Sequence, residues 1–159
     1  MPDLFYDRWG NTHRPKTKDQ AIGREGAWLA LLERDAILFA YADYAPDVAD
    51  IPGGGIDTGE TVLDAACREL FEETDLTAPN DLTILNTHNQ NINFYADDVD
   101  GYWHYTQTYF LATAKGTTLY FPEKRAVTEG HAAWIKIADL EKSAINYAHK
   151  MALNHLLKL

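Results

Sequence analysis

The sequence predicts an α/β domain whose mixed sheet is covered by helices on both faces. Strand-like runs rich in β-branched and aromatic residues alternate with two segments of helical periodicity, one in the middle of the chain and one at its end. At 159 residues and 46% hydrophobic content, the chain can bury one substantial core but is short for two. We therefore expect residues 1–159 to form a single domain.

The expected strands come in pairs. The first 25 residues are polar and predict an irregular arm or an edge strand. Alternating apolar residues and turn residues then predict two hairpins and one short strand: residues 26–32 with 36–41, 82–96 with 102–114, and 132–137. Three successive glycines, Gly53 to Gly55, follow the first hairpin and permit close approach of a neighbouring element or ligand.

Two segments repeat their apolar residues with the period of an α-helix. The first begins at Glu60 and places a core-facing stripe on an arc of about 100°; the stripe consists of Leu63, Ala66, Cys67, Leu70 and Thr74. The second begins at about Ala144, with Ser143 as the expected N-cap. Its expected stripe consists of Ile145, Ala148, Ala152, Leu156 and Leu159.

Composition excludes several classes of protein. The net charge of −10 argues against a surface for long nucleic acid, which needs clustered Lys and Arg. No run approaches the roughly 20 apolar residues that cross a bilayer, so no membrane partner is expected. The single cysteine, Cys67, excludes an intramolecular disulfide, and the N-terminus lacks the pattern of a secretory leader. A cytoplasmic location is the expectation.

Acidic residues concentrate in one short segment. Residues 54–76 hold seven of the 24 acidic residues and only one of the 14 basic residues. On the expected helix, Glu69, Glu72 and Glu73 crowd one arc, where each like-charge pair costs roughly 0.2 to 0.5 kcal/mol. A hard divalent cation would reverse that repulsion, because Mg²⁺ binds oxygen ligands. A solvated acidic face is the alternative for an isolated helix with three glutamates.

The residues before the helix distinguish these alternatives. Gly54, Glu60, Arg68, Glu69, Leu70, Glu72, Glu73 and Leu76 occupy eight of the nine defined positions of the pattern G-x5-E-x7-R-E-U-x-E-E-x-G-U, where U is a bulky aliphatic residue. This segment resembles the Nudix box, at residues 54–76. The mismatch is Asp75, where the family has glycine. Asp tolerates the left-handed conformation that ends a helix, so we expect the helix to end there without loss of chemistry.

The resemblance implies both a fold and an activity. Nudix proteins are α/β/α sandwiches that hydrolyse a nucleoside diphosphate linked to another group, with Mg²⁺ or Mn²⁺. Carried over by position, Glu69, Glu72 and Glu73 would be the metal ligands and catalytic residues. Glu60 would assist through water or by fixing the loop, Arg68 would pair with a box carboxylate, and Gly54 would shape the turn.

The resemblance leaves the catalytic base open between a box glutamate and a glutamate on a later loop. Glu129 is the later-loop candidate, because Glu129-Gly130 precedes Trp134-Ile135 much as the loop glutamate does in several family members. A solvated loop acid is the alternative for Glu129.

Substrate identity lies outside the box. Small nucleotides remain open: dNTPs, ADP-ribose, dinucleoside polyphosphates and nucleotide sugars. Alternation places Trp103, Tyr105 and Tyr109 on one face of their strand and Tyr102 and Phe110 on the other, so each aromatic either packs in the core or stacks on a base. The competing function is a Nudix-like module that binds nucleotide as a sensor without cleaving it. Many family members are homodimers, so a homodimer also stays open.

Overall fold

The computed structural model describes residues 3–76, 82–114, 125–127 and 130–158; for residues 125–127, 130 and 131 it describes only the backbone. Nine strands within these residues form one mixed sheet in the order β2-β1-β6-β7-β3-β4-β9-β8, with β5 paired to β3. The strands are β1 (Phe5–Tyr6), β2 (Thr12–His13), β3 (Ala21–Glu33), β4 (Ala36–Ala42), β5 (Gly53–Gly55), β6 (Leu82–Ala96), β7 (Gly101–Ala114), β8 (Arg125–Val127) and β9 (Gly130–Lys136).

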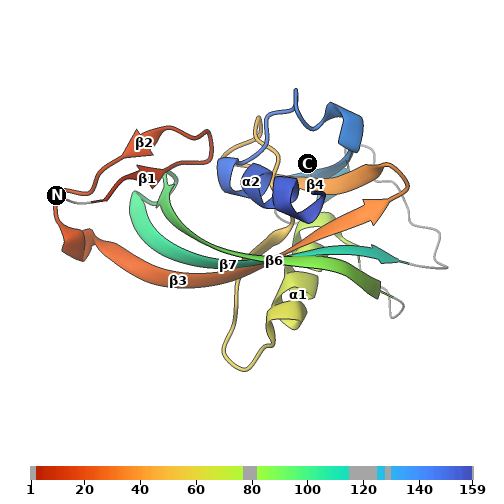
Figure 1. Cartoon of the computed structure of the whole chain (residues 1–159), viewed down its shortest axis with the longest axis horizontal. Helices are drawn as coiled ribbons and strands as arrows, with labels where there is room; N and C mark the ends of the chain where they lie inside the picture. The colour runs from red at the N-terminus through yellow and green to blue at the C-terminus, as the bar shows by residue number, and fades with distance from the viewer. Residues whose placement is uncertain (1–2, 77–81, 115–124, 128–129, 159) are drawn as a thin grey trace.

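Two α-helices cover opposite faces of the sheet, α1 (Val62–Thr74) below and α2 (Tyr147–Leu156) above it in Figure 1. Two short 3-10 helices, η1 (Lys18–Gln20) and η2 (Ile137–Asp139), connect other elements. Each face has its own buried cluster: Leu31 and Leu70 belong to the α1 side, and Tyr109 and Leu153 to the α2 side. The expected α/β class and sandwich architecture are confirmed.

Both expected hairpins are present. β3 and β4 pair antiparallel through a turn in which Arg34 has φ 56°, and β6 and β7 pair through a turn in which Asp100 has φ 49°. β3 and β7 run parallel from Ala21↔Tyr102 to Leu32↔Thr113, which makes the sheet mixed. The last expected strand is β9, which begins two residues earlier than predicted and pairs with β4.

Of the two alternatives predicted for the N-terminal segment, the edge strand is confirmed. β1 pairs parallel with β6 at Tyr6↔Phe94, and β2 pairs with β1 at the edge of the sheet. β3 begins at Ala21, five residues before the predicted strand, because residues 21–25 pair with β7 although they are largely exposed. Apolar alternation detects only the buried part of such a strand.

Helix α1 follows the prediction closely. Thr61 is the N-cap, and its hydroxyl oxygen accepts a hydrogen bond from the Asp64 N–H at 3.1 Å. Three residues of the predicted stripe, Ala66, Leu70 and Thr74, are buried, whereas Leu63 and Cys67 are only partly buried. The helix ends at Asp75, which adopts the left-handed conformation at φ 63° and ψ 15°. The expected role of Asp75 in ending the helix is therefore confirmed.

The predicted start of the second helix is wrong by three residues. α2 begins at Tyr147, and its N-cap is Asn146, not Ser143. The Ser143 hydroxyl instead donates to the carbonyl of Asp139 at 2.7 Å. Ala144 and Asn146 are tied to Ala49 by backbone hydrogen bonds of 2.9 Å, which hold this stretch extended. Residue 159, the last of the predicted stripe, lies outside the described residues. In the described part of the chain, no helix is long and apolar enough to cross a membrane.

Candidate active site

Strand β5, which consists of three glycines, lies between helix α1 on one side and the ring of Trp28 on the other. It pairs with β3 through Gly53↔Trp28 and Gly54↔Ala27. A Cβ on Gly54 would lie 2.8 Å from Glu69 Oε1, and a Cβ on Gly53 would lie 2.1 Å from Trp28 Cδ1. The absence of side chains therefore lets a helix carboxylate approach one side of the strand and an indole ring the other.

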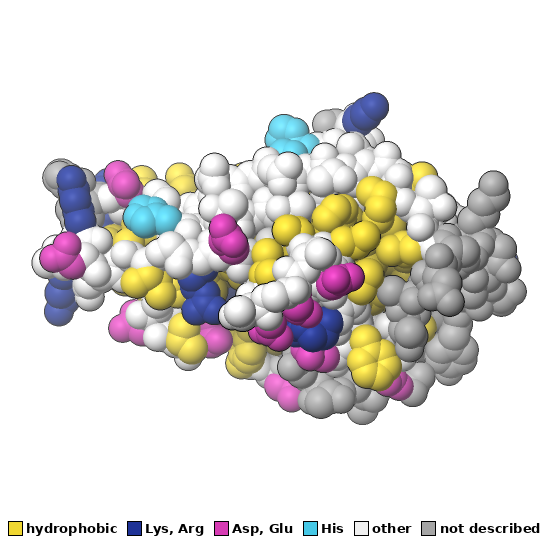
Figure 2. All heavy atoms as spheres, turned by 90° about the horizontal axis from the view of Figure 1, so that it is seen from below, with side chains coloured by type: hydrophobic (Ala, Val, Ile, Leu, Met, Phe, Trp, Pro, Cys, Tyr) yellow, Lys and Arg dark blue, Asp and Glu magenta, His cyan; other side chains and the backbone are white. Residues whose placement is uncertain are grey.

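Arg68 connects the carboxylates of the segment. Its Nε and Nη2 donate to the two oxygens of Glu60 at 2.8 and 3.0 Å, and Nη1 donates to Glu69 Oε1 at 3.0 Å. Nη1 also contacts Glu72 Oε2 at 3.2 Å, and Nη2 donates to the Gly55 carbonyl at 2.9 Å. Figure 2, viewed from the α1 side, shows acidic side chains gathered around a basic one. This arrangement neutralises part of the acidic cluster and ties α1 to the loop before it.

The electrostatic consequences follow from these contacts. Hydrogen bonds from Arg68 lower the pKa of Glu60, and the surrounding carboxylates raise the pKa of Arg68 far above its usual range. Glu73 lies apart from this cluster, with its Oε2 accepting the Gly53 N–H at 2.8 Å. Both Glu69 and Glu73 are thus held against the glycine strand, each by a different contact.

The donor set fits a hard divalent cation in its chemistry, because Glu69, Glu72 and Glu73 offer only carboxylate oxygens. Their side chains are turned toward Arg68 and the Gly53 N–H. Consequently, no three His, Cys, Asp or Glu side chains within the described residues are arranged as a ready-made metal cluster.

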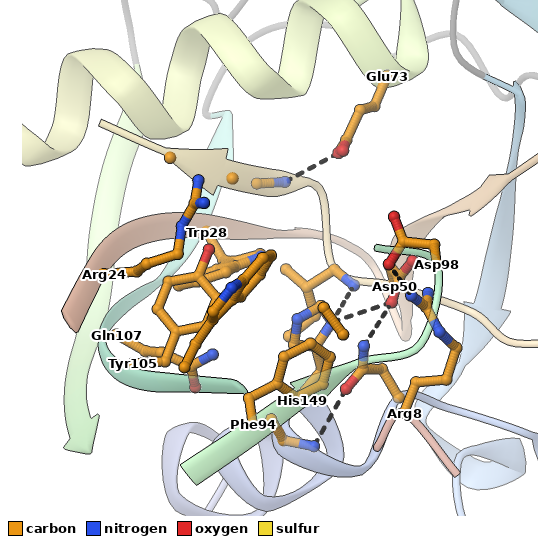
Figure 3. A pocket seen from close by; sticks show the side chains of 18 of the residues that line it. Arg8, Arg24, Trp28, Asp50, Glu73, Phe94, Asp98, Tyr105, Gln107 and His149 are labelled. Carbon is orange, nitrogen blue, oxygen red and sulfur yellow. Dashed lines mark hydrogen bonds and ion pairs between the residues drawn. The ribbon is translucent and has the colours of Figure 1, made fainter. Parts of the chain in front are cut away.

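A cavity of about 250 Å³ lies on the other side of the glycine strand (Figure 3). One side is aromatic, with Trp28, Trp103, Tyr105 and Phe94, and the Arg24 guanidinium lies 4.3 Å from the centroid of the Trp103 ring. The other side is polar and charged: Arg8, Asp50, Asp98, Asn146 and His149. Glu73 also lines the cavity, so it adjoins the carboxylate segment.

The polar side of the cavity contains two groups with displaced pKa values. Burial raises the pKa of Asp50 to about 6, against the opposing hydrogen bond from Asn146. Burial also lowers the pKa of His149 to about 3, and its Nδ1 accepts the Ile51 N–H at 3.0 Å. His149 is therefore neutral at pH 7 and carries its proton on Nε2.

A family model, the NUDIX domain, matches residues 23–155. The chain belongs to the NUDIX family. Two curated Nudix relatives are similar over shorter stretches, and both are named RNA pyrophosphohydrolase. The protein of Rhizobium meliloti (strain 1021) is 41% identical over 63 residues, which cover 39% of this chain and 36% of that protein. The protein of Bartonella quintana (strain Toulouse) is 75% identical over 24 residues, 15% of this chain and 14% of that protein. The matches thus span about a third or less of these relatives.

Solved Nudix structures share the fold at low sequence identity. A bifunctional NMN adenylyltransferase/ADP ribose pyrophosphatase from Francisella tularensis, complexed with AMP and a Mn ion, superposes with a TM-score of 0.68 and 20% identity, covering 86% of this chain and 42% of that one. The dihydroneopterin triphosphate pyrophosphohydrolase of E. coli superposes with a TM-score of 0.60 and 16% identity, covering 85% of this chain and 96% of that one. A C. elegans Ap4A hydrolase superposes with a TM-score of 0.58 and 24% identity, covering 84% of this chain and 92% of that one.

The structure brings together most residues that the Nudix box singled out. Gly54, Glu60, Arg68, Glu69 and Glu72 lie in one contact network, with Glu73 beside it on the same glycine strand. Glu129 lies outside the described residues, so its position relative to this network is not described.

The predicted faces of the aromatic strand are also confirmed. Trp103 and Tyr105 line the cavity, and Tyr109 is fully buried and stacked on Trp28 at 4.9 Å. Phe110 packs on the opposite, α1 side. Sequence reasoning did not find the polar side of the cavity, whose members Arg8, Asp50, Asn146 and His149 stand in separate segments without a shared motif.

Proposed function

We propose that this protein is a divalent-metal-dependent pyrophosphohydrolase that acts on a small nucleotide, a nucleoside diphosphate linked to another group. The observation that carries the proposal is the position of the Nudix box beside the cavity. Glu69 and Glu73 contact one side of β5, while aromatic rings line the cavity on its other side. A nucleoside in the cavity would place its pyrophosphate near the carboxylates.

In this proposal, Glu69, Glu72 and Glu73 hold a divalent cation, Mg²⁺ or Mn²⁺, because their carboxylate oxygens suit both ions. A bound divalent ion supplies neutralisation of the pyrophosphate charge and a water of lowered pKa. The rigid helix α1 fixes the spacing of the three carboxylates, and the Gly53 N–H orients Glu73. Arg68 and Glu60 hold the helix against the loop.

A general base must accept the proton of the attacking water. We keep both candidates in the proposal, a box glutamate and Glu129. We also propose that residues 1–159 act as one domain, because β1 and β2 join the same sheet as the segment that the family model matches.

The test is chromatographic separation of the products formed with Mg²⁺ or Mn²⁺ from nucleoside triphosphates, ADP-ribose, dinucleoside polyphosphates, nucleotide sugars and a short 5′-triphosphorylated RNA, because cleavage of the pyrophosphate bond yields a nucleoside monophosphate or pyrophosphate and not free phosphate. The last substrate is included because of the names of the two curated relatives. Wild type is compared with Glu72→Gln, Glu129→Gln and the exposed control Glu141→Gln. We expect one substrate class to be hydrolysed by wild type and the control, with turnover reduced at least about 100-fold in Glu72→Gln.

The competing sensor function makes the opposite prediction. A non-catalytic module would bind one of these nucleotides without turnover at any metal concentration, and that result would overturn the hydrolase proposal. Near-normal turnover of Glu129→Gln would exclude Glu129 as the base and leave a box glutamate in that role.

A further inference from the structure

We infer that Asp50 is a specificity-determining residue whose carboxylate accepts an N–H from the exocyclic amine of a nucleobase held in the cavity. The inference rests on the proposed function and names its substrate class: nucleotides with an amino-bearing base, as opposed to bases with a carbonyl at that position. Asp50 lies outside the Nudix box and contacts none of the box carboxylates through a hydrogen bond described in the structure.

The position of Asp50 is fixed by its neighbours. Its backbone exchanges two hydrogen bonds with Ala40, at 2.8 and 2.9 Å. Its Oδ1 accepts from Asn146 Nδ2 at 2.8 Å, and Asn146 is oriented in turn by the Ala148 N–H. The side chain is only 18% exposed and lines the cavity. A rigid carboxylate on a cavity wall is preorganised for one geometry of ligand.

One oxygen of this carboxylate remains available. Among the described residues, Asp50 Oδ2 receives no hydrogen bond. His149 does not serve it, because the Nδ1 atom that faces Asp50 at 3.6 Å is already the acceptor of the Ile51 N–H. Asp50 Oδ2 is not among the fully enclosed side-chain atoms of the described residues that lack a hydrogen bond, so it is accessible from the cavity that Asp50 lines. A ligand N–H in the cavity can therefore supply its hydrogen bond.

Arg8 places a positive charge near Asp50 without donating a hydrogen bond to it. Its Nε donates to Asp97 Oδ1 at 3.0 Å, and its Nη2 lies 3.5 Å from Asp98 Oδ1. Figure 3 shows Asp50 between His149 and Asp98, with Arg8 beside it on the charged side of the cavity. Arg8 belongs to the N-terminal segment, outside residues 23–155 that the family model matches. The charged side of the cavity is therefore built partly by a segment beyond the family match.

The opposite side of the cavity supports a base as the ligand. Trp28, Trp103 and Tyr105 offer flat aromatic surfaces. The carbonyl oxygen of Gln107 accepts from both Gln90 Nε2 at 2.8 Å and the Tyr109 hydroxyl at 3.0 Å, which fixes the amide orientation. Its NH₂ makes no hydrogen bond to any other described residue. The cavity thus combines an acceptor at Asp50 with a donor at Gln107, and an amino-bearing base carries an amine donor and a ring or carbonyl acceptor.

The preference against carbonyl bases follows from repulsion. A carbonyl oxygen opposite Asp50 would face a carboxylate oxygen, and neither has a hydrogen to donate. A site built around a buried hydrogen-bonding group rejects ligands that leave it unpaired more strongly than it rejects small changes in apolar shape. Two comparisons between bases of equal size, adenine against hypoxanthine and cytosine against uracil, isolate the effect of replacing the amine with a carbonyl.

The experiment measures kcat/KM for two pairs of substrates, adenosine against inosine nucleotides and cytidine against uridine nucleotides. All four carry the same phosphate-linked group, the one that the protein hydrolyses in the assay above. We expect wild type to prefer the amino member of at least one pair by about 10- to 100-fold. Asp50→Asn, which keeps an oxygen for Asn146 and adds an NH₂, should bring that ratio near one or reverse it. The control is Asp47→Asn, an exposed carboxylate in the same loop, which should leave the ratio unchanged.

Two outcomes would overturn the inference: a wild type that does not discriminate within either pair, or an Asp50→Asn variant that loses kcat/KM equally for both members. If wild type hydrolyses nothing, the proposed function fails separately, and the same ratios are then measured as dissociation constants by tryptophan fluorescence. A binding ratio that collapses in Asp50→Asn would still sustain the role of Asp50, and an unchanged one would overturn it.

Discussion

The carboxylate of Glu69 rests directly against Gly54: a Cβ built on Gly54 would lie 2.8 Å from Glu69 Oε1 and 2.9 Å from its Cδ. Gly54→Ala must therefore displace Glu69 from the glycine strand. We expect kcat to fall by about 100-fold, because small misplacements of catalytic groups have effects of that size. Gly23→Ala is the matched control, since a Cβ there meets nothing within 4 Å. Equal activity of the two variants would show that Glu69 can move without consequence.

Arg68 is the counter-charge of four carboxylates, those of Asp57, Glu60, Glu69 and Glu72. In Arg68→Ala these groups repel one another, so we expect a lower melting temperature in EDTA than for wild type. Mg²⁺ should then raise the melting temperature of the variant more than that of wild type, because the ion replaces the missing positive charge. Lys142→Ala removes an exposed cation as the control. An identical Mg²⁺ effect in both proteins would argue against a cation site at these carboxylates.

Local sequence patterns predicted α1, both hairpins and the helix end at Asp75, because each depends on periodicity or on conformational preferences of neighbouring residues. The start of α2 depends instead on backbone pairing of Asn146 with Ala49, far away in sequence. β1 likewise forms because β6 offers it an edge. Such long-range contacts leave no local signal.

The residues of the candidate site likewise form one group that the local sequence predicts and one group that it does not. The box residues are close in sequence, so their spacing on one helix predicts their proximity. Arg8, Asp50 and His149 meet on the cavity wall from the N-terminal segment, the loop after β4 and helix α2. An isolated Asp in a loop carries no sign that it will be buried, and only the fold reveals it.

Trp103 faces the cavity beneath the Arg24 guanidinium. Replacing it with leucine removes a stacking surface but keeps an apolar side chain. Since aromatic–base stacking contributes roughly 1 to 3 kcal/mol, we expect KM of Trp103→Leu to rise at least about 5-fold with a smaller change in kcat. Trp9→Leu, at an exposed tryptophan that does not line the cavity, is the control. A KM unchanged from wild type would place the base elsewhere.

His149 should make the protein sensitive to acid. Burial lowers its pKa to about 3, so the folded state binds a proton less readily than the unfolded chain, with its pKa of about 6.5. Its contribution to stability is present above pH 6.5 and is lost as pH falls toward 3. Between pH 7 and 4 we expect this loss to reach roughly 3 kcal/mol in the free energy of unfolding. His149→Asn cannot titrate, so chemical denaturation at the two pH values should show a smaller acid loss for it; equal losses would show that His149 titrates normally.

Asp50 has the opposite effect on stability. Burial raises its pKa from 3.8 to about 6, so the folded state retains a proton that the unfolded chain releases, and stability falls as pH rises from about 4 to 6. Above pH 6 the ionised carboxylate costs roughly 3 kcal/mol. Asp50→Asn removes this cost and keeps an acceptor for Asn146. We therefore expect the variant to match wild type at pH 4 and to exceed its free energy of unfolding at pH 8, with no such change in Asp47→Asn. An equal difference at both pH values would show that Asp50 titrates normally, whereas a gain confined to high pH would mean that wild type retains a destabilising carboxylate on the wall of its cavity.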